Sequence, residues 1–204
     1  SDPEDTPAEE LQVGAEGEVA DAPIGTDPLV VIDESDDQLL AELITANGLT
    51  TQEQLNISLS NVWEQLANRA AETSFVELLD EVFNQTTPGS DTFAARATDL
   101  ATRIASGDQL DLRYELETAA EMAGAAGAYA QVGDNNTRTI YINGNWLTTA
   151  RAEMVERVLL EEIGHSFDTE LNGSTDTQGD EGELFANLFI GNELSEEQRA
   201  AISS

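Results

Sequence analysis

The chain has 204 residues, of which 41 are acidic and 8 are basic, and its formal net charge at pH 7 is −33. A surface this negative repels nucleic-acid phosphates, so we expect no nucleic-acid partner. Apolar runs stay well below the roughly 18 residues that cross a bilayer, and the absence of cysteine excludes disulfides and thiolate metal sites.

The N-terminal part divides into two predicted regions. Residues 1–28 are acidic and punctuated by Pro and Gly, which predicts a linker or loosely held arm. Because the chain opens on SDPEDTPAEE without Met, we expect a segment of a larger polypeptide. Residues 29–107, which open with the short apolar island LVVI (29–32), form a predicted helical region. Two capping boxes support the helices, Ser35 with Gln38 and Thr50 with Glu53.

Residues 108–204 form the third predicted region. We expect LRYELETAAEMAGAAGAYA (112–130) to begin as a helix, and its Ala/Gly run at 123–130 to let helix and strand backbones approach closely. TRTIYING (137–144) alternates β-branched and aromatic residues, which predicts a strand. Helices are expected at about 148–171, over EGELFANLFIG up to Gly191, and after a cap formed by Ser195 with Gln198. The predicted fold class is therefore α+β, mostly helical, with a small sheet.

The predicted helix at 148–171 carries two opposite stripes. One stripe is polar: Glu161, His165 and Asp168 recur at helical spacing, with Glu162 beside them. His165 is the only histidine in the chain. The other stripe has the residues of a core, namely Val155, Leu159, Ile163 and Phe167.

The segment EEIGH (161–165) has the spacing of the zinc-binding motif H-E-x-x-H, with Glu161 at the first histidine position. Glu161 and His165 are then candidate metal ligands and Glu162 is a candidate general base. A carboxylate ligand lowers the Lewis acidity of zinc and favours harder ions, so the divalent metal could be zinc, manganese or calcium. The alternative is a lone histidine on a solvated acidic helix face, with a raised pKa.

The order of these motifs resembles the core of a zincin metallopeptidase. A strand (TIYIN), a helix (VLLEEIGHSFD) and then GDEGELFANLF follow one another as in gluzincins of the anthrax lethal factor type. The resemblance covers about residues 112–191. This segment of the chain is also similar to domains embedded in large, acidic, exported bacterial proteins with calcium-binding repeats. The resemblance therefore implies a zincin-like core and a secreted or cell-surface location, and the strong negative charge suits a salty or calcium-rich medium, as in a halotolerant protein.

The resemblance also implies roles for individual residues. Glu183 occupies the place of the third metal ligand, with Glu181 as a less favoured substitute, and Asp168 matches an acidic residue that follows the second histidine and supports the site. The strand is implied to lie at the edge of the cleft and to align substrate backbone through Ile140, Tyr141 and Ile142. Related enzymes carry a tyrosine that stabilises the oxyanion; Tyr141 and Tyr129 are the candidates here.

Two function classes remain open. The first is a catalytically degenerate zincin-like domain, a pseudoenzyme that holds a peptide or protein partner or plays a structural role. The second is an active, possibly self-processing metallopeptidase that uses Glu161, His165 and Glu183 with Glu162 as base. An acidic helical spacer is a third, weaker alternative. Separately, Asp176, Asp180 and Glu181 form an acidic group that could bind calcium, or else a solvated turn at a helix N-terminus.

Overall fold

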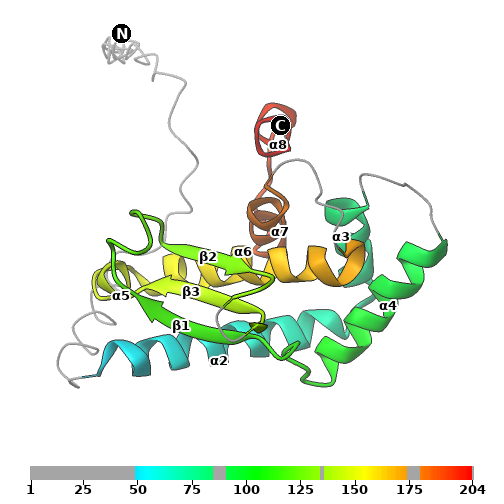
Figure 1. The fold of residues 1–204 in the computed structure, drawn as a ribbon. Coiled ribbons are helices and arrows are strands. Elements are labelled where there is room, and N and C mark those ends of the chain that lie inside the picture. The colour runs from blue at the N-terminus through cyan, green and yellow to red at the C-terminus, as the bar shows by residue number, and fades with distance from the viewer. Residues whose placement is uncertain (1–48, 85–90, 134–135, 174–179, 204) are drawn as a thin grey trace, which may run out of the picture. The chain divides into compact units, whose positions relative to one another are not determined.

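The computed structural model describes residues 49–84, 91–133, 136–173 and 180–203, and these residues form seven helices and a three-stranded sheet (Figure 1). This arrangement confirms the predicted class of a mostly helical α+β protein with a small sheet. The predicted arm (1–28), the apolar island and the capping box at Ser35 lie outside the described residues. The helices are α2 (Thr51–Ala70), α3 (Thr73–Phe83), α4 (Asp91–Ala105), α5 (Gly144–Leu147), α6 (Ala152–Asn172), α7 (Glu181–Phe189) and α8 (Glu196–Ile202).

The sheet contains β1 (Arg113–Glu117), β2 (Gly127–Ala130) and β3 (Thr139–Asn143) in the order β1-β3-β2. Strand β3 runs parallel to β1 and antiparallel to β2, with Tyr114 and Tyr129 both opposite Ile140. The prediction of a strand at 137–144 is therefore confirmed. The prediction of a helical start at 112–130 is wrong, because this segment supplies both neighbours of β3 and strand pairing outweighs its Ala-rich helical propensity.

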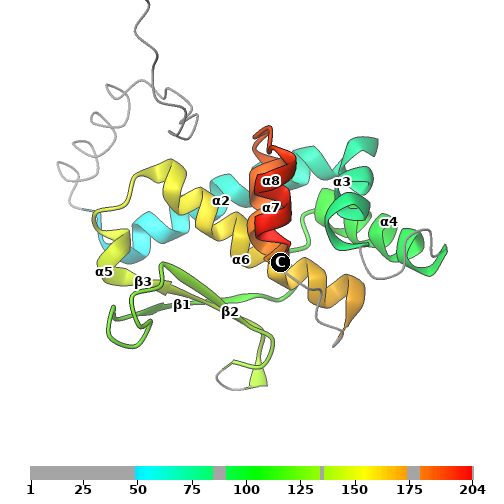
Figure 2. The same cartoon turned by 90° about the horizontal axis from the view of Figure 1, so that it is seen from above.

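The helices lie on one side of the sheet (Figure 2). One hydrophobic core joins the two layers, and Ile140 and Ile142 of β3 are fully buried in it together with Leu55, Leu79 and Ile104 of the helices before β1. The described residues belong to one compact unit, Ser35–Ser204. The predicted boundary between residues 107 and 108 therefore does not separate two cores.

Four phenylalanines fill the centre of the helical layer. Phe185 of α7 lies 5.3 Å from Phe167 of α6, measured between ring centroids, and 6.4 Å from Phe75 of α3, in edge-to-face geometry. Phe83 lies 5.9 Å from Phe185. Such contacts add to the burial of large apolar surfaces, so α7 is firmly positioned against α6.

Local sequence signals set several helix ends. Thr50 and Glu53 form the predicted capping box of α2, and Ser195 and Gln198 form that of α8. Gly107 and Gly191 follow α4 and α7 with φ of +90° and +83°. These left-handed conformations favour glycine and end the helices where the sequence predicts.

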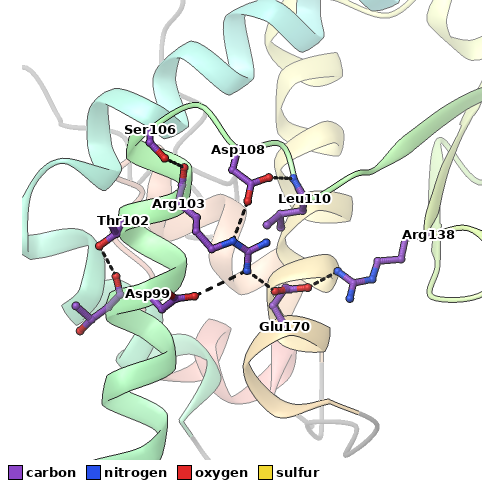
Figure 3. A network of polar contacts seen from close by, with 9 residues as sticks. Asp99, Thr102, Arg103, Ser106, Asp108, Leu110, Arg138 and Glu170 are labelled. Carbon is purple, nitrogen blue, oxygen red and sulfur yellow. Dashed lines mark hydrogen bonds and ion pairs between the residues drawn. The ribbon is translucent and has the colours of Figure 1, made fainter.

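A network of charged side chains ties α4 and α6 to the start of β3 (Figure 3). Glu170 of α6 accepts hydrogen bonds from Arg103 of α4, at 2.8 Å, and from Arg138. Arg103 also donates to Asp108, at 2.8 Å. Two arginines thus surround one carboxylate whose side chain is 17% exposed, and hydrogen bonds of this charged kind are stronger than neutral ones.

In the part of the chain that the structure describes, no helix combines the length and the apolar character needed to cross a membrane.

Candidate functional site

Helix α6 presents its two predicted stripes to different surroundings. The apolar stripe is buried in the core, and Leu159, Ile163 and Phe167 are fully inaccessible. The polar residues Glu162, His165, Asp168 and Thr169 instead line a cleft of about 460 Å³. Glu161 is absent from the lining of this cleft, so the polar stripe that faces it is shifted by one residue from the predicted one.

The opposite wall of the cleft is the backbone of β2, and one residue of α7 completes it. Gly127, Ala128, Tyr129 and Gln131 contribute the β2 side, and Glu181 contributes the α7 side. A strand, α6 and the start of α7 therefore meet at one cleft, as predicted for the three motifs, but the strand that borders the cleft is β2 and not β3.

The free edge of β2 faces away from β3. The backbone N–H of Asn143 donates to the carbonyl of Ala126 at 3.0 Å, one position beyond the last pair of the antiparallel register. Because hydrogen-bonded positions alternate in an antiparallel pair, Ala128 also faces β3, and the N–H and C=O groups of Gly127 and Tyr129 face outward. Among the described residues, β2 pairs on one side only.

This order corrects the prediction for the strand at 139–143. We expected Ile140, Tyr141 and Ile142 to lie at the edge and to align a substrate. Strand β3 is instead central, so β1 and β2 occupy both of its sides, and the side chains of Ile140 and Ile142 are fully buried. The edge position belongs to β2.

Two glycines allow the elements around the cleft to approach closely. A Cβ atom at Gly127 would lie 2.7 Å from Oε1 of Glu162, and a Cβ atom at Gly182 would lie 2.6 Å from both the Glu161 carbonyl oxygen and Nε2 of His165. Real Cβ contacts are not that short, so a larger residue would displace its neighbours. At Gly127 of the Ala/Gly run, the close neighbours are side chains of α6, Glu162 and Val158, and not its backbone.

The imidazole of His165 lies between two carboxylates. Its Nε2 is 3.6 Å from Oδ1 of Asp180, and its Nδ1 is 3.8 Å from Oε1 of Glu181. Asp180 also caps α7, because its Oδ1 accepts from the backbone N–H of Glu183 at 2.9 Å. Glu181 is only 5% exposed, and its Oε2 has no hydrogen-bond partner among the described residues.

Glu183 stays a predicted metal ligand, but the structure places Glu181 closer to His165. Helix α7 begins at Glu181, directly after the capping residue, so Glu181 is the residue that faces His165 and the cleft. Two residues later, a turn of about 200° sends Glu183 elsewhere. Its Oε1 lies 3.4 Å from Nη2 of Arg157, also on α6.

The metal site remains a prediction. Among the residues that the structure describes, no group of three or more His, Asp or Glu side chains is arranged to hold a metal ion. Of the predicted calcium group, Asp180 and Glu181 flank His165, and Asp176 lies outside the described residues. We therefore derive no chemical step through a metal.

The cleft changes the acidity of its ionisable groups. Burial is the main cause that raises the pKa of Glu162 to about 7; the charges of Glu161 and Asp180 add to it, and His165 and the backbone amide of Tyr129 partly oppose it. Burial and the carboxylates of Asp180 and Glu183 also raise the pKa of Glu161.

The imidazole responds in the opposite way to burial. Burial alone lowers the pKa of His165, but the neighbouring carboxylates of Glu181, Glu162 and Asp180 outweigh it, so the net pKa lies above the ordinary value. Near neutral pH the cleft thus combines a partly protonated Glu162 with an imidazole whose pKa is raised. Groups with such shifted pKa values are candidates for a functional site.

The remaining candidate residues take distinct positions. Asp168 lines the cleft, and its Oδ1 accepts from Nδ2 of Asn172 at 2.6 Å, which fixes its carboxylate. Of the two candidate oxyanion tyrosines, Tyr129 lines the cleft. Tyr141 alternates to the other face of the sheet, which is turned away from α6.

Sequence reasoning missed the position of β2 at the cleft and the placement of Glu181 beside His165. The tripeptide GAY at 127–129 carries a usable signal, since a glycine before an aromatic strand residue often marks a close backbone approach. Asp180 three residues before Glu183 is a helix-cap pattern that fixes the start of α7 and hence the direction of Glu181.

Comparisons of the chain with protein-family models, with curated proteins and with solved structures found no match. The residues of the cleft themselves therefore carry the functional argument.

Proposed function

We propose that this domain is a peptide-binding module, a zincin-like pseudoenzyme that holds an extended segment of a partner protein without cutting it. The observation that carries this proposal is the position of the cleft: its wall is the free edge of β2, and its floor is the polar face of α6. An extended peptide can add to such an edge as a further strand, with backbone hydrogen bonds for affinity and side-chain pockets for specificity.

The edge has the groups that strand addition needs. Gly127 and Tyr129 direct their N–H and C=O groups away from β3, toward the space where a further strand would lie. The N–H of Tyr129 already donates to the carboxylate of Glu162, so a bound strand would take over this hydrogen bond. The side chain of Tyr129 and the carboxylate of Glu162 lie beside these groups and would contact alternate side chains of the bound peptide.

Two features favour binding over catalysis. Glu161 stands where the resemblance places the first metal-binding histidine. Glu183, which the resemblance makes the third ligand, pairs with Arg157 instead. Loss of two ligands would weaken a metal site severely, while neither change affects the backbone groups of β2.

Amide chemical shifts in two-dimensional NMR spectra test the proposal. A pool of unstructured ten-residue peptides is titrated into the domain, and we expect the amides of Gly127, Tyr129 and Gln131 to shift while the peptides stay intact by mass spectrometry. Tyr129→Pro removes the ring and an outward N–H and should abolish binding, whereas Tyr129→Ala, the matched control that loses only the ring, should retain part of it. Shifts confined to the other face of the sheet, around Tyr141, would contradict binding at the edge.

A second candidate is an active peptidase in which Glu162 is the general base. One observation favours it: Glu162 lies in the cleft, against the edge strand, with a pKa of about 7 that suits proton transfer near neutral pH. The test is incubation of unstructured polypeptides with the wild type and with Glu162→Gln in the presence of zinc, manganese or calcium. Cleavage that depends on Glu162 would establish the peptidase.

Calorimetric titration tests whether the domain binds a divalent metal and which residues hold it. Zinc, manganese and calcium are titrated into metal-stripped wild type, His165→Ala and Glu183→Gln. Stoichiometric binding that both substitutions abolish would support the predicted ligand set. Binding lost in His165→Ala alone would assign the third ligand to another carboxylate, such as Glu181.

We also propose that the domain works outside the cell, in a salty or calcium-rich medium. The support is the net charge of −33, which counterions must screen. The melting temperature should rise when salt is increased from about 0.1 M to about 1 M, since the Debye length then shortens from about 10 to about 3 Å. A melting temperature that falls over this range would contradict the proposal.

A further inference from the structure

The cleft carries negative charge that the chain itself does not balance. Its charged lining residues are Glu162, Asp168 and Glu181, with His165 as the one residue that can carry a positive charge. The chain has no lysine, and none of its arginines lines the cleft. Arg138 and Arg157, on neighbouring segments, pair with carboxylates outside it.

Glu181 provides the buried acceptor that a ligand could bind. Its side chain is nine-tenths buried and lines the cleft, and one of its carboxylate oxygens has no partner among the described residues. The other oxygen lies 3.8 Å from the imidazole of His165, beyond hydrogen-bond distance. A buried carboxylate oxygen that lacks a donor is unfavourable, so a ligand that brings a donor and a positive charge would relieve it.

Glu162 supplies a second carboxylate, on the floor of the cleft beside the backbone N–H of Tyr129. It is 5% exposed and lies against β2 at Gly127, where no side chain separates it from the strand edge. A peptide added to that edge would therefore pass its side chains directly over both carboxylates.

We infer that the cleft selects an arginine or lysine side chain of the bound peptide, held by the carboxylates of Glu181 and Glu162. This inference rests on the proposed function, since the peptide backbone must lie along β2. Arginine is favoured over lysine, because its planar guanidinium donates several hydrogen bonds and can serve two carboxylates at once.

The test compares two fluorescent ten-residue peptides that differ at one central position. One carries arginine, and the other carries citrulline, which has nearly the same shape but no charge. Anisotropy titrations at about 0.15 M salt use the wild type, Glu181→Gln and Glu183→Gln. The last is a matched control on the same helix, two residues away and outside the cleft.

The expected result is that the wild type binds the arginine peptide at least about tenfold more tightly than the citrulline peptide. The preference should fall to near onefold in Glu181→Gln and persist in Glu183→Gln. Because both variants lose one negative charge, this difference excludes attraction to the acidic surface as a whole. If Glu181→Gln does not fold, Glu162→Gln is the second variant and should lower the preference in the same way.

Each contrary outcome has a distinct meaning. Equal binding of the two peptides would overturn the inference and leave the peptide-binding function standing. A preference that survives both Glu181→Gln and Glu162→Gln would also overturn it. Binding of neither peptide would overturn the proposed function and the inference together.

Discussion

Helix α6 holds one buried and one partly buried glutamate in opposite electrostatic surroundings. Glu170 accepts hydrogen bonds from Arg103 and Arg138, and these arginines lower its pKa even though burial raises it. Glu162, eight residues earlier, has no arginine partner in the described part of the chain, and burial, with the charges of Glu161 and Asp180, raises its pKa to about 7 although His165 opposes the shift. The same residue type on the same helix is thus ionised at one site and half-protonated near pH 7 at the other.

The difference separates a structural site from a candidate functional one. Around Glu170, the chain supplies its own cations and joins α4, α6 and the start of β3 (Figure 3). Around Glu162, it leaves a surplus of negative charge beside an unpaired strand edge. Proteins keep such unfavourable arrangements mainly where function requires them, which is why the cleft, and not the arginine network, is assigned the binding role.

The largest expected effect concerns the packing that creates the cleft. In Gly182→Ala the new Cβ would lie 2.6 Å from the Glu161 carbonyl oxygen, so α7 must move away from α6. We expect a loss of about 3 kcal/mol in the free energy of unfolding, measured by urea denaturation. In the control Gly144→Ala the nearest atom would be 3.5 Å away, an ordinary contact. Equal stability of the two variants would show that the close approach does not matter.

Removal of Glu170, whose charge two arginines balance, should cause the next largest loss of stability. Glu170→Ala leaves Arg103 and Arg138 without their shared acceptor, and we expect it to cost about 2 kcal/mol at pH 7. The pKa of Glu170 is lowered, so its contribution is present above its unfolded pKa and disappears as the pH falls through the folded value. Urea denaturation at pH 7 and near pH 3 should show the difference from wild type shrink in acid.

Asp99→Ala is the matched control for the network. Asp99 lies 4.0 Å from the same arginine, Arg103, but its side chain is 71% exposed. We expect a change below about 0.5 kcal/mol. A loss as large as that in Glu170→Ala would mean that charge alone, and not burial with good hydrogen bonds, determines the contribution of the network.

The contribution of Glu162 to the free energy of unfolding should depend on pH in the opposite direction. The pKa of Glu162 is raised, so the folded state keeps a proton that the unfolded state releases, and stability falls as the pH rises from about 4.5 to about 7. Glu162→Gln cannot ionise and should be about 3 kcal/mol more stable than wild type at pH 8, with little difference at pH 4. Urea denaturation across this range measures the difference. A constant offset at all pH values would contradict it.

The smallest effect compares two tyrosines on the inner face of the sheet. The hydroxyl of Tyr114 accepts from Nε1 of Trp63 at 2.9 Å, whereas the buried hydroxyl of Tyr129 makes no hydrogen bond of normal geometry among the described residues, although Thr169 lies near enough to lower its pKa. We expect Tyr114→Phe to cost about 1 kcal/mol and Tyr129→Phe less than about 0.5 kcal/mol. Thermal denaturation of both variants measures this, and the reverse order would contradict it.

The sequence predicted the features that local interactions determine. The capping boxes at Thr50 and Ser195, the strand at 139–143 and the buried stripe of α6 all follow from residues a few positions apart. The metal ligands, the calcium group and the peptide or protein partner stay predictions, because they depend on molecules outside the chain.

The features that the sequence did not predict depend on contacts between distant segments. The segment 112–130 becomes two strands only because β3 pairs with both, and nothing within the segment indicates that β3 will be central. Glu181 faces the cleft because Asp180 fixes the start of α7 and Gly182 allows it to pack against His165. A sequence pattern gives the helix but not its rotation relative to its neighbour.

The most direct test of the contrast along α6 is an NMR titration of the side-chain carboxyl carbons of Glu162 and Glu170 in the same sample. We predict that Glu162 titrates near pH 7, above the ordinary carboxyl value of 4.5, and that Glu170 titrates below 4.5. If both carboxyl groups titrate near 4.5, or if Glu162 titrates below Glu170, the cleft does not hold an uncompensated carboxylate and the assignment of the binding site fails.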